Sequence, residues 1–139
     1  MGKVLAGGTF NVIHPGHILF LEKARELGDC LVVVVSSNET AAKTKKYPVK
    51  DQEERKMQLE RIASVDKAVV GDPKDFFKIV LEERPDVIAL GYDQKLDDDV
   101  AKKILDHGIK CKIVRIKDHL EGYSTSSLMK NKKRGLFER

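Results

Sequence analysis

Short apolar runs alternate along the chain with segments in which apolar residues recur at helical spacing. The apolar runs have the length of β-strands and lie at residues 4–6, 31–35, 68–70, 86–90 and 111–116. Helical spacing is found at residues 15–27, 51–63, 74–83 and 98–107. The second and fourth runs show no polar alternation, which is typical of strands buried on both faces of a parallel sheet. The pattern predicts an α/β fold with a single doubly wound sheet of five parallel strands and right-handed crossovers.

Polar residues mark where the predicted helices begin and end. Pro15 suits a first helical turn, because the N–H that it lacks would be unpaired there in any case. Gly28 is expected to cap the other end of this helix, whose buried face would include Leu27. Asp51 and Glu54 have the spacing of a capping box ahead of the next helix. The polar stretch between these two helices, residues 38–50, is expected to be a loop.

The composition is that of a globular chain with a heavily charged surface, 41% hydrophobic and 35% charged. The 139 residues are expected to form one domain, 1–139, with a basic and flexible tail at about 130–139. No apolar run approaches the roughly 20 residues of a membrane span, and the first residues do not have the pattern expected of a signal peptide. Cys30 and Cys111 make no disulfide framework, so we expect a cytoplasmic protein. The net charge of +4 favours anionic ligands without indicating a nucleic-acid or membrane partner.

The turn at residues 7–17 carries the strongest candidate chemistry. Two glycines, a threonine and two histidines lie between a predicted strand and the start of a predicted helix. Backbone N–H groups and the helix dipole are expected to be available to an anion at such a place. His14 and His17 are three residues apart and can both face the space in front of the turn. We interpret the turn as a phosphate-binding site.

Three plainer interpretations of this turn stay open. The glycines can serve the turn alone, and the two histidines can cap the helix. A His-x-x-His pair can also be half of a metal site, but zinc needs three or four protein ligands and no further Cys or His is near in sequence. The glycine spacing matches neither the dinucleotide fingerprint nor the P-loop.

Further candidate residues lie in three other polar segments. Lys43, Lys45 and Lys46 either form a solvated surface or close over a polyphosphate. Arg55 is either a solvated charge or a phosphate ligand. The loop at residues 91–94 follows the fourth predicted strand, at the end of the sheet where ligands bind in such folds. The hydroxyl run at residues 124–127 is either a helix cap or part of the same site.

The residues Gly8-Thr9-Phe10-Asn11, followed by His14-Pro15-Gly16-His17, resemble the G-T-F-D and H-x-G-H signatures of the cytidylyltransferase-like nucleotidyltransferases. The resemblance implies a Rossmann-like fold and transfer of a nucleotidyl group from an NTP to a phosphate, with release of pyrophosphate. It also implies that both histidines contact the NTP phosphates, that lysines neutralise them, and that the 124–127 segment, similar to the family's I-S-T-T, touches them. Asn11 departs from the family's usual aspartate. Class I aminoacyl-tRNA synthetases share the H-x-G-H shape but need far more chain and a lysine-rich signature loop.

Within this superfamily the chain resembles the archaeal-type FAD synthetases most. The similarity is carried by residues 65–73 and 86–94. Glycerol-phosphate cytidylyltransferases usually have Arg-Tyr where Ala63 and Ser64 stand, and phosphopantetheine adenylyltransferases replace the first histidine. The resemblance implies adenylyl transfer from ATP to FMN, with Mg²⁺ on the phosphates and a possible homodimer. The alternatives are a nucleotidyltransferase for glycerol 3-phosphate or a sugar phosphate, and a non-catalytic nucleotide sensor.

Site residues are assigned from this turn and the resemblance together. The expected catalytic residues are His14, His17, Lys43, Lys45 and Lys46. The expected nucleotide contacts are Thr9, Phe10, Asn11, His14, Pro15, Gly16, His17, Gly91, Asp93, Tyr123, Ser124 and Thr125. No protein residue is assigned as a metal ligand.

Overall fold

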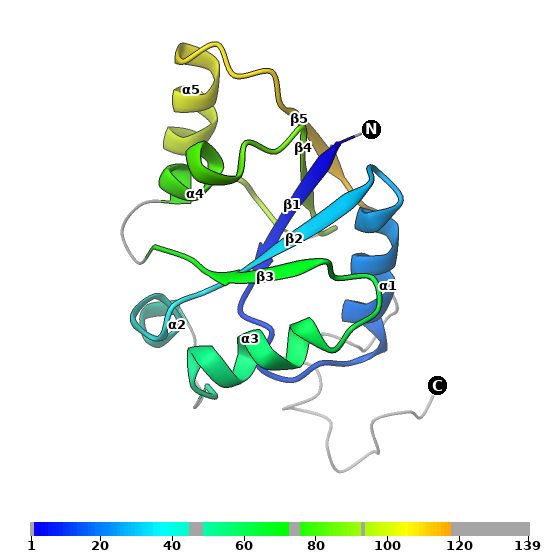
Figure 1. Ribbon diagram of the computed structural model, residues 1–139. Helices are drawn as coiled ribbons and strands as arrows, with labels where there is room; N and C mark the ends of the chain where they lie inside the picture. Colours follow the sequence, from blue (N-terminus) through cyan, green and yellow to red (C-terminus); the bar gives the residue numbers. More distant parts are fainter. Residues whose placement is uncertain (1, 45–48, 73–75, 93, 118–139) are drawn as a thin grey trace.

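Five apolar segments of the chain form one parallel sheet, and helices connect them (Figure 1). The computed structural model describes residues 2–44, 49–72, 76–92 and 94–117. The elements in chain order are β1 Lys3–Gly8, α1 Pro15–Arg25, β2 Cys30–Val35, α2 Asn38–Thr44, α3 Gln52–Glu60, β3 Lys67–Val70, α4 Phe76–Glu83, β4 Val87–Leu90, α5 Asp98–Asp106 and β5 Lys112–Arg115. The predicted α/β fold with five parallel strands is confirmed.

The strands are ordered β3-β2-β1-β4-β5 across the sheet. β1 lies in the centre, with Val4 opposite Leu31 of β2 on one side and Val87 of β4 on the other. The connections lead outwards from β1 to β3, and then return past β1 to β4 and β5. The direction of winding therefore reverses between β1 and β4, and in such sheets ligands bind beyond the carboxyl ends of the two strands at this reversal.

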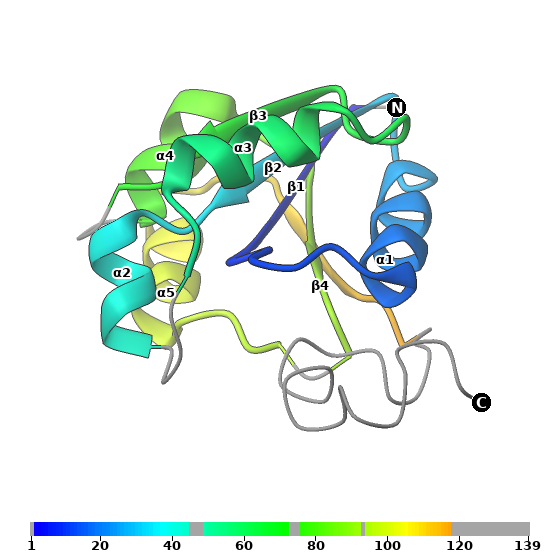
Figure 2. The same ribbon diagram turned by 90° about the horizontal axis from the view of Figure 1, so that it is seen from below.

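Side chains along each strand alternate between two apolar clusters, because successive residues of a strand point to opposite faces. The cluster beneath α1 and α3 includes Val4, Leu21, Leu31, Val33 and Leu59. The cluster beneath α4 and α5 includes Leu5, Val32, Phe77, Val80 and Ile104. Figure 2 shows α1 and α5 on opposite sides of β1 and β4. The predicted double winding is thus confirmed, and the continuous apolar sequence of β2 is explained by its burial on both faces.

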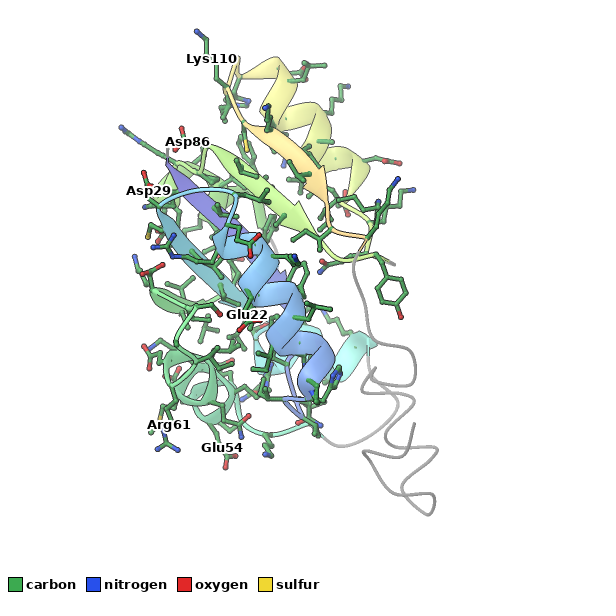
Figure 3. All side chains as sticks on the ribbon, turned by 90° about the vertical axis from the view of Figure 1, so that its right-hand side faces the viewer. Glu22, Asp29, Glu54, Arg61, Asp86 and Lys110 are labelled. Atoms are coloured by element: carbon green, nitrogen blue, oxygen red, sulfur yellow. The ribbon has the colours of Figure 1, made fainter. Side chains whose placement is uncertain are left out.

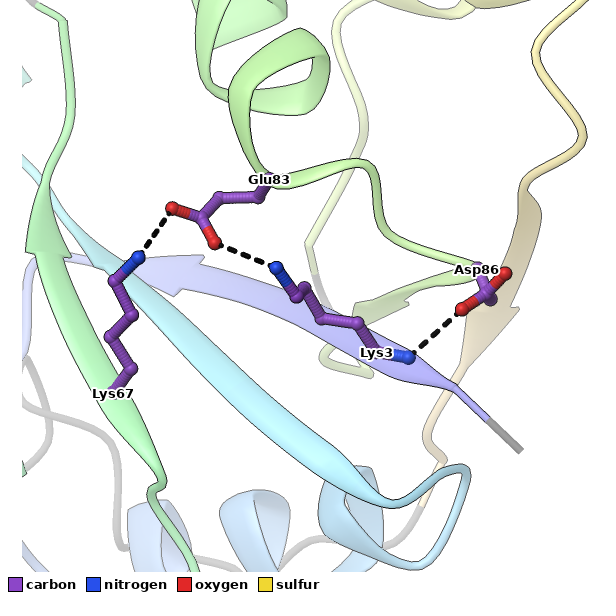
Figure 4. Close-up of polar contacts among 4 residues, drawn as sticks. All are labelled: Lys3, Lys67, Glu83 and Asp86. Atoms are coloured by element: carbon purple, nitrogen blue, oxygen red, sulfur yellow. Dashed lines mark hydrogen bonds and ion pairs between the residues drawn. The ribbon is translucent and has the colours of Figure 1, made fainter.

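The amino ends of the strands are held by a charged cluster (Figure 4). Glu83, at the end of α4, accepts hydrogen bonds from Lys3 Nζ at 3.1 Å and Lys67 Nζ at 2.9 Å. Asp86 accepts one from the backbone N–H of Lys3 at 2.9 Å. Burial alone would raise the pKa of Glu83, but the bonds from the two lysines outweigh it and hold that pKa below its ordinary value. Glu83 therefore joins β1 to β3 as a carboxylate.

Exposed charges surround this amino edge. Figure 3 shows Asp29, Asp86 and Lys110 just ahead of β2, β4 and β5. Glu22 on α1 points away from the sheet in the same view. The strands end at the opposite edge, which is where ligands bind in sheets of this kind.

Three local expectations from the sequence are wrong. Residues 38–44 form α2 rather than a loop, because Ser37 Oγ accepts a hydrogen bond from Thr40 N at 3.1 Å and so caps a short helix. The C-cap of α1 is Glu26, in a right-handed conformation, and Leu27 beyond it is exposed. Gly28 is required for a different reason, since a Cβ there would lie 2.4 Å from the carbonyl oxygen of Gly2.

Candidate active site

The candidate site lies where β1 and β4 end, at the reversal of the winding. Residues 9–14 lead from β1 into α1, and residues 91 onward follow β4. The predicted residues at positions 9, 10, 11 and 14 lie in the first of these segments, those at positions 15–17 begin α1, and Gly91 begins the second segment. Lys45, Lys46, Asp93, Tyr123, Ser124 and Thr125, also predicted, lie outside the described residues.

His14 is the N-cap of α1. Its backbone is extended, with φ −137° and ψ 170°, and Pro15 opens the helix as predicted. Its Nδ1 accepts hydrogen bonds from the backbone N–H groups of Gly16 at 3.1 Å and His17 at 3.4 Å. A nitrogen that accepts two such bonds carries no proton, so the neutral ring has its proton on Nε2. His14 therefore presents Nε2–H as a hydrogen-bond donor.

This cap changes the expectation for the helix terminus. The N–H groups of Gly16 and His17, expected to be available to an anion, are bonded to the His14 ring. Burial lowers the pKa of His14 to about 4, so the ring is neutral at pH 7. The positive end of the α1 dipole thus faces the His14 imidazole that caps the helix.

The His17 ring is fixed by two neighbouring rings. It stacks on His14 with the ring centroids 3.7 Å apart and the planes 23° from parallel. Phe10 meets it edge-on, at 5.1 Å and 63°. Phe10 is 5% exposed and has a left-handed backbone with φ 51°. Gly8 makes room for this ring, because a Cβ at that position would lie 2.9 Å from it.

Arg55 is a buried structural residue that holds the turn in place. It is neither the solvated charge nor the phosphate ligand that the sequence left open. Its side chain is 0% exposed. Nε donates to the carbonyl oxygen of Lys50 at 2.7 Å and Nη1 to that of Thr9 at 3.0 Å. Nη2 donates to Asn38 Oδ1 at 3.2 Å. Arg55 is thus a buried cross-link between the residue before Phe10, the start of α2 and the segment before α3.

Asn11, the residue after Phe10, also connects the turn to the segment before α3. It is buried, and its Oδ1 accepts a hydrogen bond from the backbone N–H of Lys50 at 2.7 Å. An aspartate would accept the same bond, so the departure from the family's usual residue preserves this contact. The two neighbours of Phe10 in sequence are therefore both tied to Lys50 or Arg55.

The second segment of the site is held by residues that the sequence did not single out. Gln94 Nε2 donates to the carbonyl oxygen of Gly7 at 2.8 Å, and its Oε1 accepts from the N–H of Gly91 at 3.0 Å. Arg115 Nη1 donates to the carbonyl oxygens of Gly91, Tyr92 and Gln94. Gln94 lies in the 86–94 stretch that carries the family resemblance, but no sequence pattern assigned a role to its side chain, and Arg115 belongs to no motif.

The remaining charged groups add less to the described site. Lys43 lies on α2 and pairs with Glu39 at 3.5 Å, with a side chain that is 67% exposed. Within the described residues, no group of three or more His, Cys, Asp or Glu side chains is placed to hold a metal ion. In the same part of the chain, no helix has the length and apolar character that crossing a membrane requires.

The low pKa of His14 predicts a specific dependence of stability on pH. The unfolded chain takes up this proton near pH 6.5 and the folded chain near pH 4, so acid favours unfolding. The contribution of His14 is complete above pH 6.5 and is lost as the pH falls towards 4, by on the order of 3 kcal/mol at most. Asn keeps a capping acceptor without titrating, so His14→Asn should show a smaller loss. Urea unfolding across this pH range measures the difference, and equal slopes for the two proteins would contradict it.

Comparison with known proteins gives matches over most of the chain. The family model described as cytidylyltransferase-like matches residues 5–132. An FAD synthase of Thermoplasma acidophilum is 41% identical over 133 residues, which cover 95% of this chain and 94% of that protein. An FAD synthase of Aciduliprofundum boonei is 44% identical over 120 residues, covering 86% and 80%. A crystal structure described as the lipopolysaccharide core biosynthesis protein of Thermoplasma volcanium has a TM-score of 0.79 and 42% identity, covering 85% of this chain and 98% of that chain.

Proposed function

The chain belongs to the cytidylyltransferase-like family, and we propose that it is an FAD synthase, which transfers the adenylyl group of ATP to FMN. The observation that carries this assignment is the similarity to FAD synthases over nearly the whole length of both chains. The stacked histidines at the start of α1 supply a site that fits the reaction.

The reaction needs positioning and charge stabilisation rather than a base. The attacking group is an oxygen of the FMN phosphate, which is already anionic at neutral pH. A bond forms from this oxygen to the α-phosphorus of ATP. The bond between that phosphorus and the oxygen that bridges it to the β-phosphorus breaks. The electron pair leaves with pyrophosphate. The protein must therefore hold the two anions in line and stabilise the charge that grows on the leaving group.

The two histidines are proposed to do this as fixed donors. His14 offers its Nε2–H from a neutral ring that is held by the α1 cap. His17 is held between His14 and Phe10, so its ring needs no reorientation during the reaction. Donors that are already in place stabilise developing charge without a reorganisation cost.

Other residues are proposed to complete the nucleotide site. Lys43, Lys45 and Lys46 would neutralise the triphosphate, and the hydroxyl run from Ser124 would contact the phosphates. Gly91, Asp93 and Tyr123 would meet the nucleoside, since the loop after β4 lies at the reversal of the winding. Mg²⁺ would enter with ATP. Bound in that way, it would neutralise phosphate charge.

For location and assembly we propose a cytoplasmic protein that acts on small molecules without nucleic acid. Cys30 and Cys111 are both free thiols, as expected in a reducing compartment. A homodimer is proposed from the family resemblance.

Purified protein should convert FMN and ATP into FAD and pyrophosphate when Mg²⁺ is present, with CTP a poorer donor than ATP. The assay pairs ATP and CTP with FMN, glycerol 3-phosphate, sugar 1-phosphates and phosphopantetheine, and measures pyrophosphate and each product. If FMN is inert while another phosphate is consumed, the chain is a nucleotidyltransferase with a different acceptor. Absence of pyrophosphate with every pair would instead favour a nucleotide sensor.

The sugar phosphates belong in the panel for a specific reason. The similar Thermoplasma volcanium structure is described as a lipopolysaccharide core biosynthesis protein, which names a sugar pathway. An FAD synthase from the same organism is 41% identical to this chain over 133 residues. FMN therefore remains the preferred acceptor.

A further inference from the structure

The two central strands β1 and β4 pair over only part of their length. Their register covers Val4 with Val87 and Leu5 with Ile88. By contrast, β1 pairs with β2 as far as Gly8, and β4 pairs with β5 as far as Leu90. In the part of the chain that the structure describes, the β1–β4 ladder therefore ends before either strand does.

The side chain of Gln94 bridges the two strand ends beyond this point. It donates to the carbonyl oxygen of Gly7 in β1 and accepts from the N–H of Gly91, directly after β4. A side-chain amide carries the same donor and acceptor as a peptide group. The Gln94 side chain therefore takes the place of a direct backbone hydrogen bond between β1 and β4. Because this connection is longer than a direct bond, its length sets the distance between the ends of the two strands.

Arg115 holds the other side of the same loop. It is the last residue of β5, and its Nη1 donates to the carbonyl oxygens of Gly91 at 2.8 Å, Tyr92 at 3.3 Å and Gln94. Bonds from a charged donor are stronger than those between neutral groups. The loop after β4 is thus fixed from β1 by Gln94 and from β5 by Arg115.

We propose that Gln94 and Arg115 are positioning residues. They hold the loop that begins at Gly91, assigned to the nucleotide base, in place relative to the turn with His14 and His17, assigned to the phosphates. This role rests on the proposed function for the identity of the nucleotide. Gly7 lies near the end of β1, the strand that leads into the segment with His14 and His17, whereas Gly91 begins the loop assigned to the nucleoside. The Gln94 bridge therefore fixes the distance between the two ends of a bound nucleotide.

This role requires an amide rather than a general polar residue. Glutamate keeps an acceptor for the Gly91 N–H but faces the Gly7 carbonyl oxygen with a second acceptor. Asparagine is one methylene shorter and cannot span both partners at their present spacing. Methionine has a similar length and neither hydrogen bond, so Gln94→Met removes the bridge with the least change in shape.

The test measures nucleotide binding, which does not depend on the acceptor. Dissociation constants of ATP and CTP are determined by calorimetry for the wild-type protein, Gln94→Met and Arg115→Met, with melting temperatures measured alongside. Gln58→Met and Arg61→Met on α3 are the matched controls. For both loop variants we expect ATP binding to weaken about tenfold, the scale of one or two lost hydrogen bonds. We expect the ratio of CTP to ATP dissociation constants to fall about threefold or more, because a loosened loop reads the base less well.

A role in stability alone would lower the melting temperature of the variants and leave both dissociation constants unchanged, which would overturn the proposal. Arg115 is exposed, so its variant is expected to fold even if Gln94→Met does not. A wild-type protein that binds ATP but makes no FAD would overturn the FAD synthase assignment, while the variants would still test the loop. A wild-type protein that binds neither nucleotide would overturn both.

Discussion

Replacing His17 with alanine is expected to slow FAD formation by about 100- to 1000-fold, the scale of losing one fixed donor to a developing charge. The ring is held between His14 and Phe10, so its contribution is made in the transition state rather than by adjustment to ATP. ATP binding should therefore change far less than turnover.

Steady-state kinetics and ATP calorimetry on the same preparations separate these two effects. His107→Ala is the matched control, because His107 is exposed on the far side of the sheet and its ring packs on Phe77. Near-normal turnover in His17→Ala would remove His17 from the proposed chemistry. An equal loss in both variants would indicate a general effect of histidine removal.

Replacing Arg55 with methionine is expected to have the largest effect on stability. The guanidinium is fully buried and satisfies the carbonyl oxygens of Thr9 and Lys50 and the side chain of Asn38. Methionine fills much of the volume but leaves the carbonyl oxygens of Thr9 and Lys50 without this donor, at about 1–3 kcal/mol for each such group. We expect a loss of about 3–5 kcal/mol, which corresponds to a fall of about 10 °C or more in melting temperature.

Urea and thermal unfolding measure this loss directly. Arg61→Met, at the exposed end of the same helix, should change the free energy of unfolding by less than about 0.5 kcal/mol. If Arg55→Met were as stable as Arg61→Met, the hydrogen bonds of Arg55 would not hold the turn.

The sheet could be predicted from the sequence because its inner strands, β2, β1 and β4, are largely buried. β2 has to be apolar at nearly every position, and so it reads as a continuous run in the sequence. α2 could not be predicted in the same way, because it is seven residues long and depends on the Ser37 cap rather than on an apolar stripe. Short helices leave little periodicity to detect.

The sequence predicted a turn with His14 and His17 between β1 and α1, but it did not predict the hydrogen bonds of that turn. That His14 Nδ1 accepts the first N–H groups of α1 depends on the orientation of a side chain, which no spacing reveals. The burial of Arg55 depends on acceptors from residues 9, 38 and 50, which are distant in sequence and meet through the fold. Polar networks of this kind are specified by tertiary structure, so local sequence patterns do not report them.

Phe10 combines a strained backbone with a buried ring. Its left-handed backbone, with φ 51°, is one that glycine adopts freely and an aromatic residue does not. The ring is 5% exposed and belongs to the cluster that includes Val4 and Leu21. Removing a buried phenylalanine costs about 3–5 kcal/mol, which exceeds the roughly 1–3 kcal/mol of strain that glycine would relieve. Phe10→Gly is therefore expected to lower the stability of the chain, and the same change removes one of the two rings that hold His17.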